Sequence, residues 1–188
     1  MATPPETVAT AIRSWSSCPH PLVVAIDGHG ASGKSTLADG LRRHLDVAVI
    51  HTDDFFRATA ERNGHLTTEP MARYYDATRL RDEALVPLRN GEDVRFSAFD
   101  EEHNHFRDEP VTIAPASVIV LEGVSSAGPA LRDLVDRSIL VHTPLDTRVE
   151  RLRRQITHDA WDEEWLEAER KYFEVLGPGY FDLTVSGS

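Results

Sequence analysis

Four short apolar runs are spaced along the chain, and segments with helical periodicity separate them. The runs are rich in valine, isoleucine and leucine and cover residues 21–27, 47–53, 117–123 and 137–143. Continuous apolar runs of this length are typical of parallel strands that are covered on both faces. A shorter run at residues 182–185 is a fifth candidate strand.

Apolar residues recur at three- and four-residue spacings in the segments around these runs. This pattern predicts helices over residues 5–17, 35–45, 78–91, 145–156 and 161–176. Strands that alternate with helices predict a three-layer α/β fold with a mainly parallel sheet. The length of 188 residues fits one domain, so we expect residues 1–188 to form a single unit.

The region from residue 53 to residue 115 departs from this alternation. Its first part, residues 55–77, is long, polar and without clear periodicity, and loops of that length are usually functional. Its last part contains two strand-like stretches, residues 94–100 and 109–115, joined by the charged turn EEHNHFRD. These stretches predict a small β-hairpin that forms a flap beside the main sheet.

The charge of the chain opposes one class of partner. The formal net charge is −11, whereas affinity for nucleic acids comes largely from clustered lysine and arginine side chains. We therefore expect no nucleic-acid partner. Only two of the 20 basic residues are lysines, Lys34 and Lys171, which makes a lysine retained in a glycine-rich segment informative.

Cysteine usage and the length of the apolar runs indicate the compartment. The single cysteine, Cys18, cannot form an internal disulfide, and no apolar run approaches the roughly 18 residues of a membrane span. The N-terminal stretch carries Glu6 and no uninterrupted apolar core, so it is unlike a signal peptide. These features predict a cytoplasmic protein without a membrane partner, and they leave a homo-oligomer open.

The stretch GHGASGKS, from Gly28 to Ser35, matches the phosphate-loop pattern G-x-x-x-x-G-K-[ST]. It lies between a predicted strand and a predicted helix, which is the context that the pattern requires. Backbone N–H groups of such a loop point at phosphates, Lys34 reaches the β- and γ-phosphates, and the Ser35 hydroxyl is a ligand for Mg²⁺. The alternative is a tight glycine turn with a stray lysine. The pattern predicts that a nucleoside triphosphate is bound by Gly28, His29, Gly30, Ala31, Ser32, Gly33, Lys34, Ser35 and Thr36.

Acidic residues follow two other predicted strands, and ligands of open parallel sheets bind outside the carboxyl ends of the strands. Asp53 and Asp54 stand where a carboxylate can accept the proton of an attacking hydroxyl and help to hold a metal ion. Glu122 stands where it can bind Mg²⁺ directly or through water. The structural alternatives are a helix cap at the two aspartates and a solvated turn at Glu122.

Three arginines, Arg148, Arg151 and Arg154, are spaced along nearly one face of the predicted helix over residues 145–156. Guanidinium groups in such a row can clamp a phosphate that is being transferred. The alternative is a solvated helix on which Glu150 pairs with an arginine.

The remaining chemistry-bearing residues give weaker signals. His103 and His105 lie two residues apart in a predicted loop without a cysteine partner, which does not make a zinc site and favours a substrate-side or merely exposed position. Trp161 and Trp165 lie four residues apart, and this spacing favours helix packing over a ligand platform.

Taken together, these motifs resemble the uridine kinase and phosphoribulokinase-like family of P-loop kinases, and they are most similar to the uridine kinases. The resemblance implies a P-loop NTPase fold with a hairpin flap and a helical lid over residues 145–160. The combination of D-x-F-[FY]-R after the second strand with [LF]-E-G after a later one is its most specific part. The stretches that carry it are GHGASGKST, HTDDFFR, YYDATRL, VRFSAFD, VIVLEGV, DTRVERLRR and YFDLTV.

The resemblance implies roles for individual residues. It implies that Asp53 is the catalytic base, that Lys34 and Arg151 assist at the phosphates, and that Ser35, Asp53 and Glu122 surround Mg²⁺. It places Arg154 near ATP. The positions that it assigns to the acceptor substrate are Phe56, Arg57, Tyr75, Asp76, Phe99, His103 and Arg148.

Our first hypothesis is therefore an ATP- and Mg²⁺-dependent kinase that phosphorylates a small nucleoside-like molecule, at the 5′-hydroxyl of a pyrimidine ribonucleoside. A second hypothesis keeps the kinase and changes the acceptor to nicotinamide riboside, pantothenate or a sugar. A third is a nucleotide-dependent switch protein without an acceptor. The absence of N-K-x-D disfavours a GTPase, and Asp53 with a long loop after it would have no evident purpose in a switch.

Overall fold

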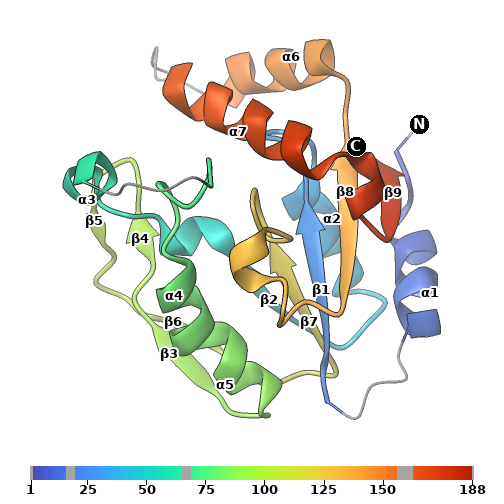
Figure 1. Cartoon of the computed structure of the whole chain (residues 1–188). Helices are drawn as coiled ribbons and strands as arrows, with labels where there is room; N and C mark the ends of the chain where they lie inside the picture. The colour runs from blue at the N-terminus through green and yellow to red at the C-terminus, as the bar shows by residue number, and fades with distance from the viewer. Residues whose placement is uncertain (1, 16–19, 65–68, 156–162, 188) are drawn as a thin grey trace.

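The computed structural model describes residues 2–15, 20–64, 69–155 and 163–187. Its central sheet has five strands in the order β2-β7-β1-β8-β9, all paired in parallel (Figure 1). The strands are β1 Leu22–Asp27, β2 Val47–His51, β7 Val118–Glu122, β8 Arg137–His142 and β9 Leu183–Ser186. All five candidate strands are therefore confirmed, and so is the predicted α/β class.

The register of the sheet brings three chain segments to one edge. Glu122 at the end of β7 lies opposite Ile26 in β1 on one side and opposite His51 in β2 on the other. The glycine-rich loop after β1, the aspartates after β2 and Glu122 therefore emerge side by side. This is the geometry expected of carboxyl ends in a parallel sheet.

Helices cover both faces of the sheet. Both faces need cover because the apolar side chains of each strand alternate between them. The helices α1 Pro5–Trp15 and α2 Lys34–Leu41 pack on the face that carries Val24 and Ile26. On the opposite face, Val23 and Ala25 join a second cluster with the helical segment of residues 77–89. Each buried Val, Leu or Ile contributes about 1.5–3 kcal/mol, so these two clusters hold the layers together.

The helix predicted over residues 78–91 contains one wide turn. It consists of α4 Ala77–Leu80, a π-helical turn η2 Arg81–Leu85 and α5 Val86–Arg89. Pro87 has no N–H to donate within the helix, and a wider turn before it relieves the resulting break in the hydrogen-bond ladder.

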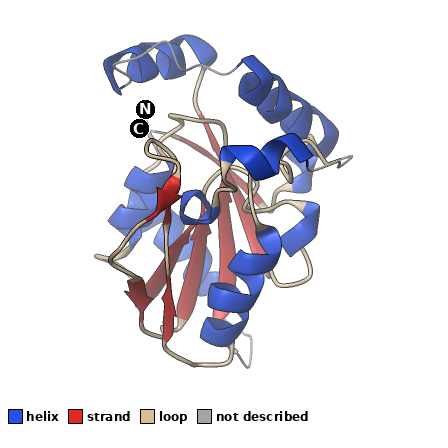
Figure 2. Ribbon diagram, turned by 90° about the vertical axis from the view of Figure 1, so that its left-hand side faces the viewer, coloured by secondary structure: helices blue, strands red, loops and turns tan. Residues whose placement is uncertain are grey.

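The predicted flap is present as two short antiparallel ladders beside the main sheet (Figure 2). β3 Val94–Phe96 pairs with β6 Val111–Ile113, and β4 Phe99–Asp100 pairs with β5 His105–Phe106. The hairpin is interrupted between the ladders, where the guanidinium of Arg79 donates a hydrogen bond to the Ser97 carbonyl. The Ser97 carbonyl therefore accepts a hydrogen bond from a side chain at this point.

The segment of residues 55–77 contains more regular structure than its sequence indicated. The helix α3 Thr59–Gly64 follows a short 3₁₀ turn, η1 Thr52–Phe55, and residues 65–68 lie outside the described residues. An isolated bridge joins Phe56 to Tyr75 and closes the segment. Further 3₁₀ turns are η3 Pro129–Leu131 and η4 Pro178–Tyr180.

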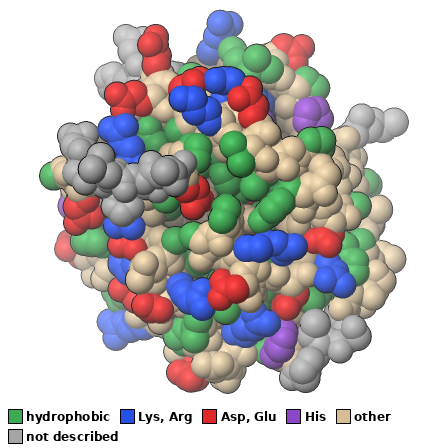
Figure 3. Space-filling model, viewed as in Figure 1, with side chains coloured by type: hydrophobic (Ala, Val, Ile, Leu, Met, Phe, Trp, Pro, Cys, Tyr) green, Lys and Arg blue, Asp and Glu red, His purple; other side chains and the backbone are tan. Residues whose placement is uncertain are grey.

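Two helices, α6 Leu145–Gln155 and α7 Glu163–Leu176, lie above the carboxyl end of the sheet (Figure 1). The last residues of the predicted lid, the ends of the helices predicted at 5–17 and 161–176, and Trp161 lie outside the described residues. No helix in the described part of the chain is both long and apolar enough to cross a membrane. On the face in Figure 3, Lys and Arg side chains lie among Asp and Glu side chains.

Candidate active site

The loop between β1 and α2 has the backbone shape that its glycines allow. Gly28 and Gly33 have φ values of 149° and 96°, and a Cβ at Gly28 would lie 2.4 Å from the Val141 carbonyl oxygen. Gly33 precedes α2 without any side-chain cap, and the positive end of the helix dipole lies at this point. The backbone of this loop and the start of α2 therefore form a site that favours an anion.

Neighbouring strands and loop atoms hold this loop in place. Asp27 accepts a hydrogen bond from the Gly28 N–H at 2.7 Å, and Thr143 donates one to the Ser32 carbonyl at 2.8 Å. The Lys34 side chain is buried, and its Nζ donates to the His29 carbonyl at 3.0 Å. The lysine ammonium is thereby kept inside the loop.

Gly123 allows the ends of β2 and β7 to approach each other closely. Its φ is 141°, and a Cβ at this position would lie 1.8 Å from Thr52 Oγ1. The adjacent Glu122 is 5% exposed and accepts hydrogen bonds from Ser35 Oγ at 3.1 Å and from the ring of His51, whose Nδ1 lies 2.7 Å away. The bond to Glu122 raises the pKa of His51. Glu122 is thus tied to the first turn of α2 and not to a solvated turn.

Asp53 lies at the start of η1, beside these groups. Its Oδ1 accepts a hydrogen bond from the Tyr75 hydroxyl at 3.0 Å. Burial, and secondly the negative charge of Glu122, raises the pKa of Asp53. His51 occupies the cap position of η1 without a side-chain cap bond, so neither aspartate caps this turn.

The donor atoms around Ser35 fit a magnesium ion. Mg²⁺ prefers oxygen ligands, and Ser35 Oγ, Asp53 and Glu122 supply only oxygen. The charge of Glu122 raises the pKa of Asp53, which is a repulsion that a cation between them would relieve. Only two of these three ligands are carboxylates. Within the described residues, no cluster of three or more His, Cys, Asp or Glu side chains could hold a metal ion.

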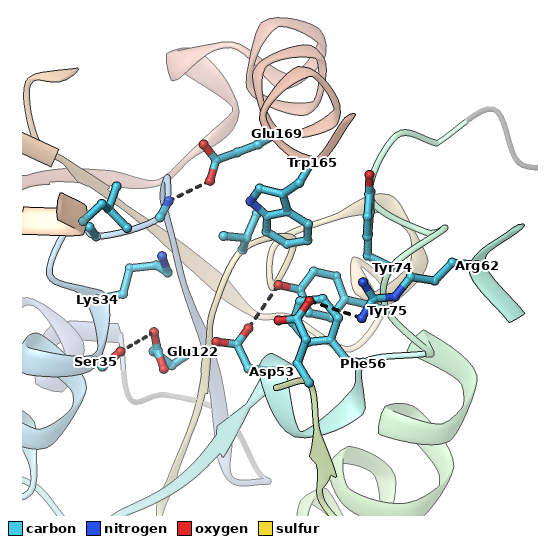
Figure 4. A pocket seen from close by; sticks show the side chains of 15 residues that line it. Lys34, Ser35, Asp53, Phe56, Arg62, Tyr74, Tyr75, Glu122, Trp165 and Glu169 are labelled. Atoms are coloured by element: carbon cyan, nitrogen blue, oxygen red, sulfur yellow. Dashed lines mark hydrogen bonds and ion pairs between the residues drawn. The ribbon is translucent and has the colours of Figure 1, made fainter. Parts of the chain in front are cut away.

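A cavity of about 330 Å³ joins the glycine-rich loop to a chamber lined by aromatic side chains (Figure 4). We call the loop of residues 28–36 with Glu122 the donor half. The acceptor half consists of Phe56, Arg62, Tyr74, Tyr75 and Trp165. Asp53 lies between the two halves, which is where a group that acts on both reactants is needed.

The side chains of the acceptor half pack against one another. The ring of Trp165 lies 4.8 Å from that of Tyr74 and 5.5 Å from that of Phe56, measured between centroids. The Arg62 guanidinium lies 4.9 Å from the centroid of the Phe56 ring and forms an ion pair with Glu101 at 3.2 Å. The chamber therefore offers flat apolar walls with a charged rim.

Not every residue of the glycine-rich loop faces this cavity. Gly30, Ala31, Lys34 and Ser35 line it. The His29 ring instead packs against Phe173 of α7, with centroids 4.1 Å apart.

Several predicted acceptor residues have partners elsewhere. Arg57 and Asp76 form an ion pair at 3.2 Å, and Asp76 also caps α4 by accepting from the Arg79 N–H. Phe99 is buried against Phe106 in the flap. These residues therefore do not line the 330 Å³ cavity, and their proposed contacts to a substrate stay predictions.

His103 lies in the exposed turn of the flap. Its side chain is 63% exposed and bonds to Asp100. His105 in β5 is also exposed, and its Nδ1 lies 2.7 Å from the Phe106 carbonyl.

The three lid arginines differ in their surroundings. Arg148 is buried and lies 3.5 Å from the Gly30 carbonyl, and Arg151 donates to the Ala31 carbonyl at 3.0 Å. Arg154 is 75% exposed and pairs with Glu150 one turn away. The alternative of a solvated helix therefore fits Arg154, whereas Arg148 and Arg151 contact the donor half.

The sequence interpretation missed the contribution of α7. Trp165 packs against aromatic rings as predicted, and it also lines the cavity. Glu169, one turn later, accepts a hydrogen bond from the Gly30 N–H at 2.7 Å. The spacing of four residues puts Trp165 and Glu169 on one helix face, whereas the prediction from the sequence used only the spacing of Trp161 and Trp165.

The sheet order and the loop after β1 define an α/β P-loop protein of the kinase type. No protein-family model matches the chain. A uridine kinase from Shewanella piezotolerans is 33% identical over 139 residues, which are 66% of this chain and 64% of that protein. The match thus spans less than two thirds of the relative's length.

Two solved structures share the fold. A possible uridine kinase from Bacillus stearothermophilus has a TM-score of 0.72 and 21% identity, with 96% of each chain covered. A D-glycerate 3-kinase from Cryptococcus neoformans has a TM-score of 0.63 and 15% identity, with 89% of this chain and 86% of that chain covered. With these similarities in sequence and fold, the chain belongs to the uridine kinase-like family of P-loop kinases.

Proposed function

We propose that this protein transfers the γ-phosphoryl group of ATP to the 5′-hydroxyl of a pyrimidine nucleoside. The observation that carries the proposal is the position of Asp53. Its carboxylate is held by Tyr75 on the wall of the cavity, between the glycine-rich loop and the aromatic chamber. A kinase needs a carboxylate at this point, where the attacking hydroxyl meets the phosphate.

The donor half would bind the triphosphate. Backbone N–H groups of the loop and the Lys34 ammonium would neutralise the phosphates, and Arg151 would approach from α6. Ser35, Glu122 and Asp53 would hold Mg²⁺, which supplies charge neutralisation at the phosphate oxygens. The buried position of Lys34 supports this role because its charge is weakly screened there.

On the acceptor side, Asp53 would orient the substrate hydroxyl and take up its proton as the new O–P bond forms. ADP leaves with the electrons of the broken bond between the γ-phosphorus and the bridging oxygen. Burial and the neighbouring Glu122 raise the pKa of Asp53, which makes it a better proton acceptor than an exposed aspartate. The bond from Tyr75 fixes the carboxylate in one orientation.

The aromatic walls of the chamber support a nucleoside over a smaller alcohol. Phe56, Tyr74 and Trp165 line the cavity, and their aromatic rings suit a flat heterocycle. The similar Shewanella protein is named uridine kinase. A three-carbon acid such as glycerate, the acceptor in the name of one structural neighbour, would leave these walls unused.

ADP release with a panel of acceptors tests the proposal. Uridine and cytidine should stimulate ADP release from ATP and Mg²⁺, and nicotinamide riboside, pantothenate, glycerate and fructose should not. Stimulation by one of the other acceptors alone would replace the nucleoside while keeping the kinase. Binding of ATP with no stimulation by any acceptor would contradict the phosphoryl transfer itself.

A further inference from the structure

The carboxylate of Glu169 has an unusual position for an acidic side chain. It lies in the middle of α7 and is 3% exposed, whereas glutamate is almost never fully buried unless it is paired. Its partners all belong to the donor half or to the lid. Oε1 accepts from the Gly30 N–H at 2.7 Å, and Oε2 lies 3.0 Å from Nδ1 of His29 and 3.7 Å from a guanidinium nitrogen of Arg148.

These partners keep the carboxylate charged. Burial by itself would raise the pKa of Glu169, but the hydrogen bonds from the His29 ring and the Gly30 N–H, together with the charges of His29 and Arg148, lower the net pKa. A buried charge with such bonds is tightly fixed, because loss of a partner leaves part of a desolvated charge without compensation.

Glu169 acts at the crest of the loop, where the other side-chain bonds, from Arg148, Arg151 and Lys34, all go to backbone carbonyls. Asp27 holds the loop at Gly28, and Thr143 holds it at Ser32. The crest between them carries Ala31, which has a φ of 56°. A non-glycine residue in this left-handed region is strained and persists only where its surroundings impose it.

The crest also sets the position of the lysine. The His29 carbonyl accepts the bond from Lys34 Nζ, while the ring of the same residue faces Glu169. A shift of His29 would therefore move the ammonium that is proposed to meet the phosphates. Figure 4 shows Glu169 above the loop, with Trp165 on the same helix facing the acceptor half.

We propose that Glu169 is a positioning residue: from α7 it fixes His29 and Gly30 so that the phosphate loop is preset for the triphosphate. The proposal rests on the proposed function only for the identity of the ligand. It requires that Glu169 stays bonded to His29 and Gly30 when the nucleotide binds, and that its carboxylate does not compete with the phosphates for the loop.

Two variants separate the hydrogen-bonding role of the side chain from its volume. Glu169→Met keeps an unbranched chain of similar size without an oxygen acceptor, and Glu169→Gln keeps one oxygen acceptor for the Gly30 N–H. Glu167→Met is the matched control, because Glu167 lies on the solvent side of the same helix and pairs with Arg170 and Lys171.

The direct measurement is the Kd of a fluorescent ATP analogue, which needs neither an acceptor nor turnover. We expect Glu169→Met to raise this Kd roughly 10- to 100-fold, the effect of losing a hydrogen bond to a charged group. Glu169→Gln should recover most of the loss, and Glu167→Met should match the wild type. With uridine as acceptor, the KM for ATP should rise more than the KM for uridine.

His29→Phe is a second test of the same bond, and it changes no residue of α7. A phenyl ring can keep the packing on Phe173 but cannot bond to Glu169, so the Kd should rise by a smaller factor than in Glu169→Met. An unchanged Kd in folded Glu169→Met and His29→Phe would overturn the proposal. Tighter binding in Glu169→Met would overturn it as well and would identify the carboxylate as a competitor of the phosphates. A nucleotide that binds as expected without any phosphorylated product would refute the kinase reaction and leave this inference standing.

Discussion

The donor half and the acceptor half of the cavity are built in different ways. The donor half is one continuous stretch, residues 28–36, whose contacts are made largely by backbone atoms, together with Glu122. The acceptor half gathers side chains from the end of η1, from α3, from the segment before α4 and from α7. A backbone site recognises a feature shared by all nucleoside triphosphates, whereas a side-chain site can be changed residue by residue.

This difference predicts that damage to the two halves has different kinetic signatures. Changes in the donor half should affect every acceptor equally, because all of them depend on the same phosphate. Changes in the acceptor half should affect the KM for the acceptor and should spare ATP binding.

Replacement of Lys34 by alanine should have the largest effect on the donor half. The lysine charge is the main positive charge of the described loop, and loss of one such group from a buried site costs about 10²–10³ in kcat. The loss should be the same factor for uridine and for cytidine. Steady-state kinetics with both acceptors measures it, and unequal losses would contradict the separation of the halves.

Replacement of Trp165 by alanine should have an intermediate effect that is confined to the acceptor. Stacking of a base on an aromatic ring contributes about 1–3 kcal/mol, so the KM for uridine should rise roughly tenfold or more. The Kd of an ATP analogue should change less than twofold. A rise in this Kd comparable to the rise in KM would show that α7 does not act separately on the two halves.

The smallest effect concerns pH. Asp53 must be ionised to accept a proton, and burial with the charge of Glu122 raises its pKa above the ordinary value of 3.8. In the protein without Mg²⁺ and nucleotide, the Asp53 carboxyl should therefore take up its proton at a higher pH than an exposed aspartate does. An NMR titration of the Asp53 side chain in the Mg²⁺-free protein measures this, with circular dichroism at each pH to establish that the protein is folded. A midpoint at or below 3.8 would contradict the raised pKa.

The sequence was sufficient to predict the donor half and the order of the elements. Strand periodicity placed the ends of β1, β2 and β7, and the carboxyl ends of parallel strands must meet at one edge, so Lys34, Asp53 and Glu122 could be brought together. The phosphate-loop pattern is contiguous and needs no tertiary information. These predictions depended only on local pattern and on sheet geometry.

Only part of the acceptor half could be predicted: the resemblance named Phe56 and Tyr75, which line the cavity, but not Arg62, Tyr74 or Trp165. Trp165 lies about 90 residues from Tyr74 in sequence, and only the path of α7 over the sheet brings the two rings together. Arg62 and Glu169 have partners 39 and 139 residues away. The resemblance named Arg57, Asp76 and Phe99 for the acceptor, but in this structure their contacts are with protein groups.

The central claim is that Asp53 is the base of a phosphoryl transfer, and one comparison tests it most directly. Uridine-dependent ADP release should fall about 10²–10⁴-fold in Asp53→Asn, while an ATP analogue binds with a nearly unchanged Kd. Asp54→Asn is the matched control, because Asp54 is the next residue and does not line the cavity, so its activity should stay near that of the wild type. Equal activity of Asp53→Asn and the wild type would contradict the account.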